Sequence, residues 1–480
     1  MDKSISDKMK EININELDFD NKESIKKTFQ LLFNFIEYLV AENNELKIDN
    51  QNLKNELNIL KGEKGKPDIK PNKKNSDKPK NVNKNNKETN WKKGSKKGKI
   101  KIDREEVVGV DKTKLPNDAV FKGFKEIIIQ NIVIKTDNVL YKLETYYSPS
   151  ENKTFTASLD QSLQNTEFAP EIKALIYTLY YECRVTENII ASFLKTFGIL
   201  ISEGTISNIL IKEKADVLTE EQKAIFEAGL KSSTYQQIDD TGMRVAGKNE
   251  YATVVCNNEY SAFFINSKKN RETVRQILSG RQDLKEGELI GSFKILIADD
   301  AGQFKKLTEL LGLCWVHEER HYEKLVPFVP YNKELLDMII SQIWDFYNEL
   351  KEYKLSPSND FKLKLETEFD KIFLQTTGYD DLDKRLALTY AKRENLLLVL
   401  DYPEIPLHNN VSEQSARIVV IKRKISGGVR NQLGKSAWMN GLTILATSKK
   451  QAVNFYNYIR DIFAGRENRL HLADIILTNK

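Results

Sequence analysis

The sequence predicts a multidomain α+β protein, and three observations carry that prediction. A leucine heptad runs through residues 29–60, a lysine-rich stretch follows it, and short strand-like segments alternate with helical ones from residue 234 onward. A chain of 480 residues is too long for one compact core, so two to four domains are expected. Hydrophobic residues make up 40% of the chain, which suits globular domains and is low for a membrane protein.

Composition also excludes several classes of protein. There is no run of 18 apolar residues, and the opening residues 1–4 do not resemble a signal peptide, so we expect no membrane partner. The cysteines Cys183, Cys256 and Cys314 are odd in number and far apart, which argues against a disulfide framework and favours a reducing, cytoplasmic compartment. The chain has no C-x-x-C pair, so a zinc ribbon is not expected.

Residues 1–60 are expected to form an N-terminal helix that pairs as a dimeric coiled coil. Apolar residues recur at alternating spacings of three and four for more than four heptads. Asn43 and Asn50 at core positions favour a parallel dimer in one register. The alternative is a single amphipathic helix packed on its own domain, but the apolar stripe is only two positions wide. The d positions are Leu32, Leu39, Leu46, Leu53 and Leu60.

Residues 61–101 contain sixteen lysines against four acids, and they are interrupted by Pro67, Pro71 and Pro79. Such a segment cannot bury enough apolar surface to fold, so it is interpreted as a disordered basic linker. Its charge favours a polyanion, most often nucleic acid, although basic linkers also serve solubility alone.

Residues 102–160 are expected to form a small β module. The segments 126–134 and 139–146 have the composition of strands, and Asp137-Asn138 lies between them as a turn. The module contains no cysteine, so no zinc is expected there.

Residues 161–230 are expected to be helical and to contain a helix-turn-helix. One helix opens at Thr186-Glu187, Gly198 breaks it, and a second helix begins at Ser202. Ser202, Thr205 and Ser207 are the residues expected to contact DNA phosphates or base edges. An ordinary helical hairpin would have the same outline.

Residues 231–322 predict the first part of a ribonuclease-H-like α/β domain. Three meandering strands are expected at 234–241, 250–255 and 261–265. A helix at 271–278 and a fourth strand at 293–300 follow, and a fifth strand is expected to run into a helix within 313–322.

The second part of that domain follows a long helical stretch. Residues 323–400 read as almost wholly helical and are too many for a loop, so they are interpreted as an all-helical insertion. Residues 401–480 then complete the domain with the helix that carries Glu413, long helices over residues 434–463 and a tail expected to fray.

Acidic residues stand at both central strand ends, Asp239-Asp240 and Asp299-Asp300. Ligands of open α/β sheets gather at the carboxyl ends of strands. Phosphodiester chemistry needs about three carboxylates there to hold two divalent ions about 4 Å apart, and oxygen ligands favour Mg²⁺ or Mn²⁺. Asp after a strand is also a common turn residue, so each pair alone has an ordinary explanation.

The segment from Leu407 to Arg417 supplies a further acid. Asn409 or Asn410 can cap a helix, which places Glu413 on its first turn and Arg417 four residues later on the same face. A capped surface helix with an ion pair between Glu413 and Arg417 would be the ordinary explanation. Arg417, Lys422, Arg423 and Lys424 are expected to contact DNA phosphates, although Lys422 would equally suit a solvated face.

From about residue 160 to 465 the chain resembles the insertion-sequence-66 family of bacterial DDE transposases. The most specific match is the block around Asn409, Asn410 and Glu413. The matching residues are Asp239-Asp240-Thr241 with Arg244-Val245, Ala298-Asp299, Cys314-Trp315-x-His317-x-x-Arg320, Pro406-Leu407-x-Asn409-Asn410-x-x-Glu413-x-x-x-Arg417, Arg423-Lys424 and Gly427-Gly428. The sequence departs from the family at His408, where Asp is usual, at Asp240, where Glu is usual, and in lacking the cysteine-rich module.

The resemblance implies a catalytic, metal-binding triad of Asp239, Asp299 and Glu413 with two Mg²⁺ or Mn²⁺ ions. It implies DNA contacts from Asn409 and Asn410, and Cys314, His317 and Arg320 form a supporting motif. Cys314 and His317 could bind a metal, but two ligands are half a site, so a structural or DNA-positioning role is favoured.

The leading hypothesis is therefore a nucleoid-associated transposase. It would bind the terminal inverted repeats of its own element and target DNA as a homodimer or higher oligomer. It would cleave 3′ ends and transfer them, and the sequence leaves open whether accessory proteins take part. A non-catalytic DNA-binding protein derived from a transposase is the second hypothesis, and a coiled-coil scaffold is the third.

Overall fold

The structure is a computed structural model, and it describes residues 21–60, 101–111, 115–116, 118–160, 163–164, 166–280 and 289–478. Two compact units divide the chain: one comprises Asn138–Lys480 together with the residues up to Asp49, and the other comprises Asn50–Asp137. The linker expected at residues 61–101 lies outside the described residues except for Lys101.

The helix expected over the heptad stretch is present as α2 (Lys22–Leu60). It begins after Asn21, whose side chain accepts the backbone N–H of Glu23 at 3.0 Å. The apolar heptad residues of α2 are largely exposed, with Leu46 at 63% and Leu53 at 65%.

The strands expected at 126–134 and 139–146 are not formed as predicted. Residues 118–143 contain no strand, and their apolar side chains, such as Ile129 and Leu140, are exposed. The hairpin instead joins β1 (Thr145–Ser148) to β2 (Lys153–Thr156). Its turn uses Asn152 in the left-handed conformation, at φ 47°, in place of the expected turn at Asp137-Asn138.

A helical region precedes the sheet, as expected. Ser202 caps the second helix of the expected pair by accepting the backbone N–H of Thr205 at 3.1 Å, and Gly198 has φ 82° between the two helices. The elements are α3 (Pro170–Tyr177), the π-helix η5 (Thr178–Glu182), α4 (Glu187–Thr196), α5 (Glu203–Ile211) and α6 (Ala215–Lys231).

A five-stranded mixed sheet forms the centre of the larger unit, in the order β5-β4-β3-β6-β7. The first three strands are antiparallel neighbours, and β6 and β7 continue the sheet as parallel strands. The strands are β3 (Tyr235–Val245), β4 (Lys248–Cys256), β5 (Ser261–Asn266), β6 (Ile295–Ala298) and β7 (Leu310–Leu313), with α7 (Arg271–Ser279) between β5 and β6.

Two strand boundaries differ from the prediction. The first strand does not end at its acids, because antiparallel pairing with β4 carries β3 on to Val245. The fifth strand ends at Leu313, three residues after it begins, and α8 (Trp315–Glu323) takes up the rest of the segment predicted to contain it.

The helices expected within residues 323–400 are present, and their hydrophobic core also includes residues of β3, β6 and β7. Trp315 of α8 belongs to that core and donates from its indole N–H to the carbonyl of Leu396 at 2.9 Å, which fastens the insertion to the sheet domain. The insertion comprises α9 (Pro330–Leu355), α10 (Asn359–Phe373), α11 (Asp380–Tyr390), α12 (Arg393–Leu396) and the 3-10 helix η7 (Leu398–Leu400).

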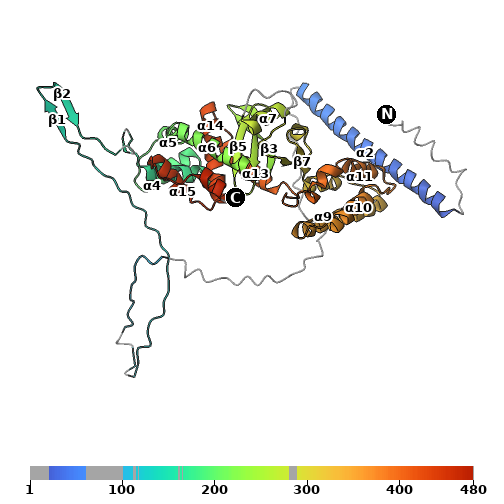
Figure 1. Cartoon of the computed structure of the whole chain (residues 1–480), viewed down its shortest axis with the longest axis horizontal. Coiled ribbons are helices and arrows are strands. Elements are labelled where there is room, and N and C mark those ends of the chain that lie inside the picture. The colour runs from blue at the N-terminus through green and yellow to red at the C-terminus, as the bar shows by residue number, and fades with distance from the viewer. Residues whose placement is uncertain are drawn as a thin grey trace. The chain divides into compact units, whose positions relative to one another are not determined.

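The chain then returns to the sheet and the helical region. In Figure 1 the last helices of the chain, in red, lie among the helices of residues 170–231, in teal and green, whereas the helix of residues 410–426 packs against β3 and β4. These helices are α13 (Asn410–Ser426), α14 (Gln432–Lys450), α15 (Phe455–Phe463) and α16 (Leu472–Thr478). The expectation of a fraying tail is wrong, because Leu472 and Ile476 are fully buried. None of the helices in the described ranges has the length and apolar character needed to cross a membrane.

Candidate active site

The sheet register brings two aspartates side by side. On the parallel strands β3 and β6, Gln237 pairs with Ile297, an offset of 60 residues. This is the last pair of that ladder, and Asp239 and Asp299 each come two residues after it, with Asp299 just past the end of β6. The two carboxylates lie near enough for the charge of Asp299 to raise the pKa of Asp239. Residues two apart on a strand point to the same face, so both carboxylates emerge where the parallel ladder ends.

The second member of each aspartate pair is occupied by other partners. Asp240 accepts a hydrogen bond from Gln303 Nε2 at 2.7 Å, and Lys269 Nζ lies 3.4 Å from it. Asp300 has two lysine partners, Lys305 at 2.7 Å and Lys392 at 2.6 Å.

The first members have only backbone partners among the described contacts. Asp239 Oδ1 accepts the N–H of Asp240 at 2.8 Å, and Asp299 Oδ1 accepts the N–H of Ala301 at 3.1 Å. The pairs are therefore chemically unequal, and the first aspartate of each keeps oxygen atoms available for a ligand.

Asn409 brings Glu413 to the same sheet edge. Its side-chain amide donates to the carbonyl of Ile238 on β3 at 2.7 Å, and its backbone N–H donates to Cys314 Sγ at 3.2 Å. These two hydrogen bonds join the start of α13 to the sheet. Because Asn409 is only 1% exposed, its side chain cannot make the DNA contact that was expected of it.

The expected cap of α13 is replaced by a different one. Asn409 makes no side-chain cap hydrogen bond, and the backbone N–H of Asn410 instead lies 3.4 Å from His408 Nδ1. The ordinary explanation of the segment, an ion pair between Glu413 and Arg417, is not what the structure has either. Glu413 faces α8, with Oε1 3.5 Å from His317 Nδ1 and Oε2 3.5 Å from Arg320.

The charge distribution of the site favours a bound cation. Burial, reinforced by the nearby carboxylates of Asp299, Asp240 and Glu413, raises the pKa of Asp239 to about 7. Within the described part of the chain, the buried atoms Asn409 Oδ1 and Glu413 Oε1 lack a hydrogen-bond partner. Crowded carboxylates and unsatisfied oxygen atoms suit hard divalent ions such as Mg²⁺ or Mn²⁺.

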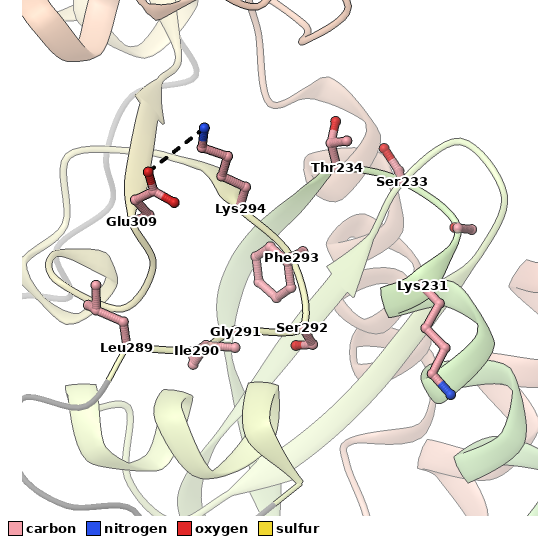
Figure 2. A pocket seen from close by; sticks show the side chains of 11 residues that line it. Lys231, Ser233, Thr234, Leu289, Ile290, Gly291, Ser292, Phe293, Lys294 and Glu309 are labelled. Carbon is pink, nitrogen blue, oxygen red and sulfur yellow. Dashed lines mark ion pairs between the residues drawn. The ribbon is translucent and has the colours of Figure 1, made fainter.

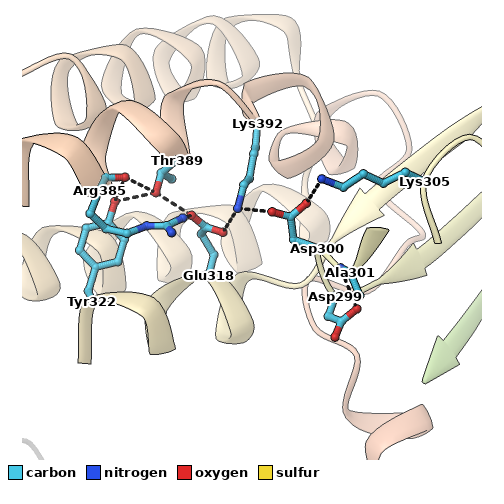
Figure 3. A network of polar contacts seen from close by, with 9 residues as sticks. All are labelled: Asp299, Asp300, Ala301, Lys305, Glu318, Tyr322, Arg385, Thr389 and Lys392. Atoms are coloured by element: carbon cyan, nitrogen blue, oxygen red, sulfur yellow. Dashed lines mark hydrogen bonds and ion pairs between the residues drawn. The ribbon is translucent and has the colours of Figure 1, made fainter. Parts of the chain in front are cut away.

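A polar network that sequence reasoning missed supports the strand end at Asp299 (Figure 3). Lys392 bridges Asp300 and the buried Glu318 of α8, at 2.6 and 3.0 Å. Glu318 also accepts from Thr389 Oγ1 at 2.6 Å and pairs with Arg385, both on α11. The network joins the helical insertion to the sheet. In the sequence, only Asp300, the residue after Asp299, pointed to it.

The basic residues of α13 separate into three environments. Arg417 and Lys424 are exposed and remain available to phosphates. Arg423 donates to the carbonyl of Gly242 on β3, so it holds α13 against the sheet. Lys422, expected to contact phosphate or solvent, is only 2% exposed.

An aromatic cage around Lys422 accounts for its burial. Its Nζ donates to the carbonyl of Tyr180 in the π-helix at 2.9 Å and lies 3.4 Å from the centroid of the Tyr180 ring. Tyr181 and Trp438 form the other walls. Lys422 therefore ties the helix that bears Glu413 to the helical region.

The residues of the helix-turn-helix that were expected to contact DNA also differ in exposure and in their hydrogen bonds. Ser202 and Thr205 are engaged in capping α5, with their hydroxyls 2.9 Å apart, although Ser202 is exposed. Ser207 is half-buried.

A cavity of about 640 Å³ lies at the opposite end of the parallel strands (Figure 2). It is lined by residues 231–234 and 289–294 and by Glu309, which pairs with Lys294 at 3.8 Å. These residues precede β3, β6 and β7, whereas the acids follow the parallel ladder. The cavity is therefore separate from the carboxylate site.

Comparison with known proteins identifies the family. Residues 165–437, more than half of the chain, match the transposase IS66 family. The chain belongs to that family. The matched segment contains every residue of the carboxylate site, from Asp239 to Glu413.

One curated relative is also similar to this IS66-family chain. It is the uncharacterized protein y4jO of Sinorhizobium fredii (strain NBRC 101917 / NGR234), which is 39% identical over 167 residues. The match covers 35% of this chain and 51% of that protein, so the chain spans about half the length of the curated relative.

Proposed function

We propose that this IS66-family transposase is a DDE enzyme with a ribonuclease-H-like catalytic domain. It would bind the ends of its own element, cleave the 3′ ends and join them to target DNA. The observation that supports it most is the raised pKa of Asp239, to which the nearby carboxylates of Asp299 and Glu413 contribute besides burial. These are the three acids that the family resemblance implies.

The chain's own residues would prepare the reaction in three ways. Asp239, Asp299 and Glu413 would hold two Mg²⁺ or Mn²⁺ ions. Bound ions of this kind activate the attacking water or 3′-hydroxyl and stabilise the leaving oxygen. Asn409 fixes the start of α13 against β3, and the Lys392–Asp300 pair fixes the strand end beside Asp299.

DNA would be held by exposed basic side chains and by the helix-turn-helix. Arg417 and Lys424 lie on the exposed side of α13, so they would contact phosphates without reading sequence. Helices α4 and α5 would recognise the terminal repeats, with Ser202 at the exposed N-terminus of α5. The free heptad face of α2 would join two copies.

The decisive experiment is cleavage of a labelled DNA that carries the element's own ends, with Mg²⁺ and with EDTA. Wild type would be compared with Glu413→Gln and with Glu404→Gln, an exposed acid outside the site, as the matched control. Nicking that needs both Mg²⁺ and Glu413 supports the proposal. Tight binding of the ends without nicking would favour a non-catalytic DNA-binding protein instead.

A further inference from the structure

Three possible metal ligands of different chemistry meet between α8 and α13. The thiol of Cys314, the imidazole of His317 and the carboxylate of Glu413 each offer one atom, and these atoms all lie within 4.8 Å of one another. Cys314 is buried, and the other two residues are half-buried. From the sequence, Cys314 and His317 amounted to half a site, and the fold supplies a third ligand from 96 residues further along the chain.

The distances suit a bound ion better than a hydrogen bond. His317 Nδ1 and Glu413 Oε1 are 3.5 Å apart, which is long for a hydrogen bond. Two ligands bonded at about 2.0–2.1 Å in a tetrahedron lie roughly 3.4 Å apart. Both atoms are buried, and neither has a hydrogen-bond partner among the residues that the structure describes.

Burial raises the pKa of the Cys314 thiol, and the hydrogen bonds that its sulfur accepts from backbone N–H groups oppose the rise. Cys314 is the N-cap residue of α8 without a side-chain cap hydrogen bond, and its Sγ accepts the backbone N–H of Asn409 at 3.2 Å. Hydrogen bonds of this kind favour the charged form of the group that accepts them. A bound divalent ion would supply the remaining stabilisation of the thiolate, since a coordinating thiol is deprotonated.

Arg320 supplies positive charge to the same site. Its guanidinium is 3.2 Å from His317 Nε2 and 3.5 Å from Glu413 Oε2. Because arginine cannot accept a hydrogen bond, Nε2 must accept here, which leaves the proton on Nδ1. An ion at Nδ1 would require the other tautomer and the withdrawal of Arg320, and this side chain is 44% exposed, so it has room to turn into solvent.

We propose that Cys314, His317 and Glu413 form a binding site for a borderline-soft divalent cation such as Zn²⁺. Thiolate and imidazole ligands select such ions over Mg²⁺, which prefers oxygen. Three protein ligands leave a fourth position open. The site is distinct from the oxygen-only site of Asp239 and Asp299, and the two share Glu413.

Sharing Glu413 has a consequence for catalysis. When the soft ion takes the carboxylate, Glu413 is withdrawn from the Mg²⁺ site, so Zn²⁺ inhibits DNA cleavage and excess Mg²⁺ relieves the inhibition. This consequence rests on the proposed function, whereas binding of the soft ion does not.

The test is a titration of the full chain with Co²⁺, which reports a bound thiolate through its sulfur-to-cobalt charge-transfer absorption. The three cysteines provide matched variants: Cys314→Ser removes the proposed ligand, and Cys183→Ser and Cys256→Ser leave it in place. One equivalent of Co²⁺ should produce the absorption in wild type and in both controls, and Cys314→Ser should lose it. Zn²⁺ should displace the cobalt, and Mg²⁺ should not.

His317→Gln provides a second variant, since a change at the buried Cys314 can disturb folding. This variant retains Cys314, and it should bind cobalt at least about tenfold more weakly than wild type. A wild type without the absorption, or a folded Cys314→Ser variant that keeps it, would overturn the proposal. A chain that binds cobalt in this way but nicks no DNA would support the site and contradict only the proposed function.

Discussion

Single residues in the two aspartate pairs have different tasks. Asp239 and Asp299 accept hydrogen bonds from backbone N–H groups, whereas Asp240 and Asp300 form ion pairs with lysines. Strand alternation predicts that only one aspartate of each pair points inward, but alternation cannot say which. The lysine partners supply that answer, and they come from loops and from the helical insertion.

We predict that Asp239→Asn and Asp299→Asn reduce DNA cleavage more than about 100-fold, since loss of an outer-shell partner alone costs about 10–100-fold. Asp240→Asn, the matched control one residue away, should keep cleavage within about tenfold of wild type. The measurement is the nicking rate of the end-labelled DNA, together with a binding assay. Equal losses in Asp239→Asn and Asp240→Asn would contradict the assignment.

Lys422 is predicted to make stability depend on pH. Burial lowers its pKa to about 7, with Glu187 opposing the shift and Arg184 adding to it. Between pH 7 and the ordinary lysine pKa near 10, the unfolded chain binds this proton and the folded chain does not. The contribution of Lys422 to the free energy of unfolding therefore rises with pH in that window, by up to about 1.4 kcal/mol per pH unit.

The corresponding experiment is urea unfolding at pH 7.5 and pH 9. Lys422→Met should lower the slope of the unfolding free energy against pH over this interval, while Lys354 and Lys450, whose pKa values are also lowered by burial, keep their own contributions. Lys424→Met, two residues away and exposed, should keep the slope of wild type. An unchanged pH dependence in Lys422→Met would mean that the buried amine stays charged within its aromatic cage.

The sequence nominated the three acids of the candidate site but not their surroundings. Asp299 follows a strand end and Glu413 follows a helix start, which have local signatures, and the family resemblance singled out these two residues together with Asp239. The burial of Asn409 and Lys422 could not be predicted, since each is decided by a partner about 170 to 240 residues away in sequence, Ile238 and Tyr180. In the sequence, a buried basic residue on an amphipathic helix cannot be distinguished from an exposed one.

Among the elements, α2 has two faces with different tasks. Glu37, on one face, is buried and accepts the backbone N–H groups of Phe328 and Val329, each at 2.8 Å. These groups stand at the start of α9, which has no side-chain cap of its own. Asn34 likewise accepts the N–H of Asp380 at the start of α11. The helix α2 thus caps two helices of the insertion.

Glu37→Ala is predicted to loosen this contact. Loss of a capping carboxylate costs about 0.5–2 kcal/mol, which corresponds to a roughly 2- to 30-fold change in an opening equilibrium. Hydrogen exchange of the Phe328 and Val329 amides should speed up by that factor. Glu45→Ala, on an exposed part of the same helix, should change neither amide, and a similar acceleration in this control would show that the effect does not come from capping.

Across the whole molecule, the sequence predicted the order of elements and missed some of their limits. The meander, the strand before Asp299 and the helices within residues 323–400 follow from hydrophobic periodicity, which is a local property. The module at 102–160 was wrong in detail because strands need a partner, and apolar β-prone residues do not specify where the partner lies. The contact of α2 with the helical insertion was also missed, because the heptad pattern describes only one face of the helix and Glu37 lies on another.

The final prediction concerns assembly. The docked residues Asn34 and Glu37 lie outside the heptad seam, and the seam residues Leu39, Leu46 and Leu53 are 41%, 63% and 65% exposed. Docking on the insertion therefore leaves the seam free for a second copy, as the heptad predicts. Wild type should sediment as a dimer.

Leu46→Asp combined with Leu53→Asp should give monomers, because each dimer would otherwise bury four carboxylates in an apolar seam. Gln51→Asp, on the same helix outside the seam, should remain dimeric, and so should Glu37→Ala, because the capping face and the seam are separate. Sedimentation at several protein concentrations distinguishes these outcomes. A dimer that survives both leucine changes would place the interface elsewhere, and a monomeric Glu37→Ala variant would show that α2 must dock on the insertion before two copies can pair.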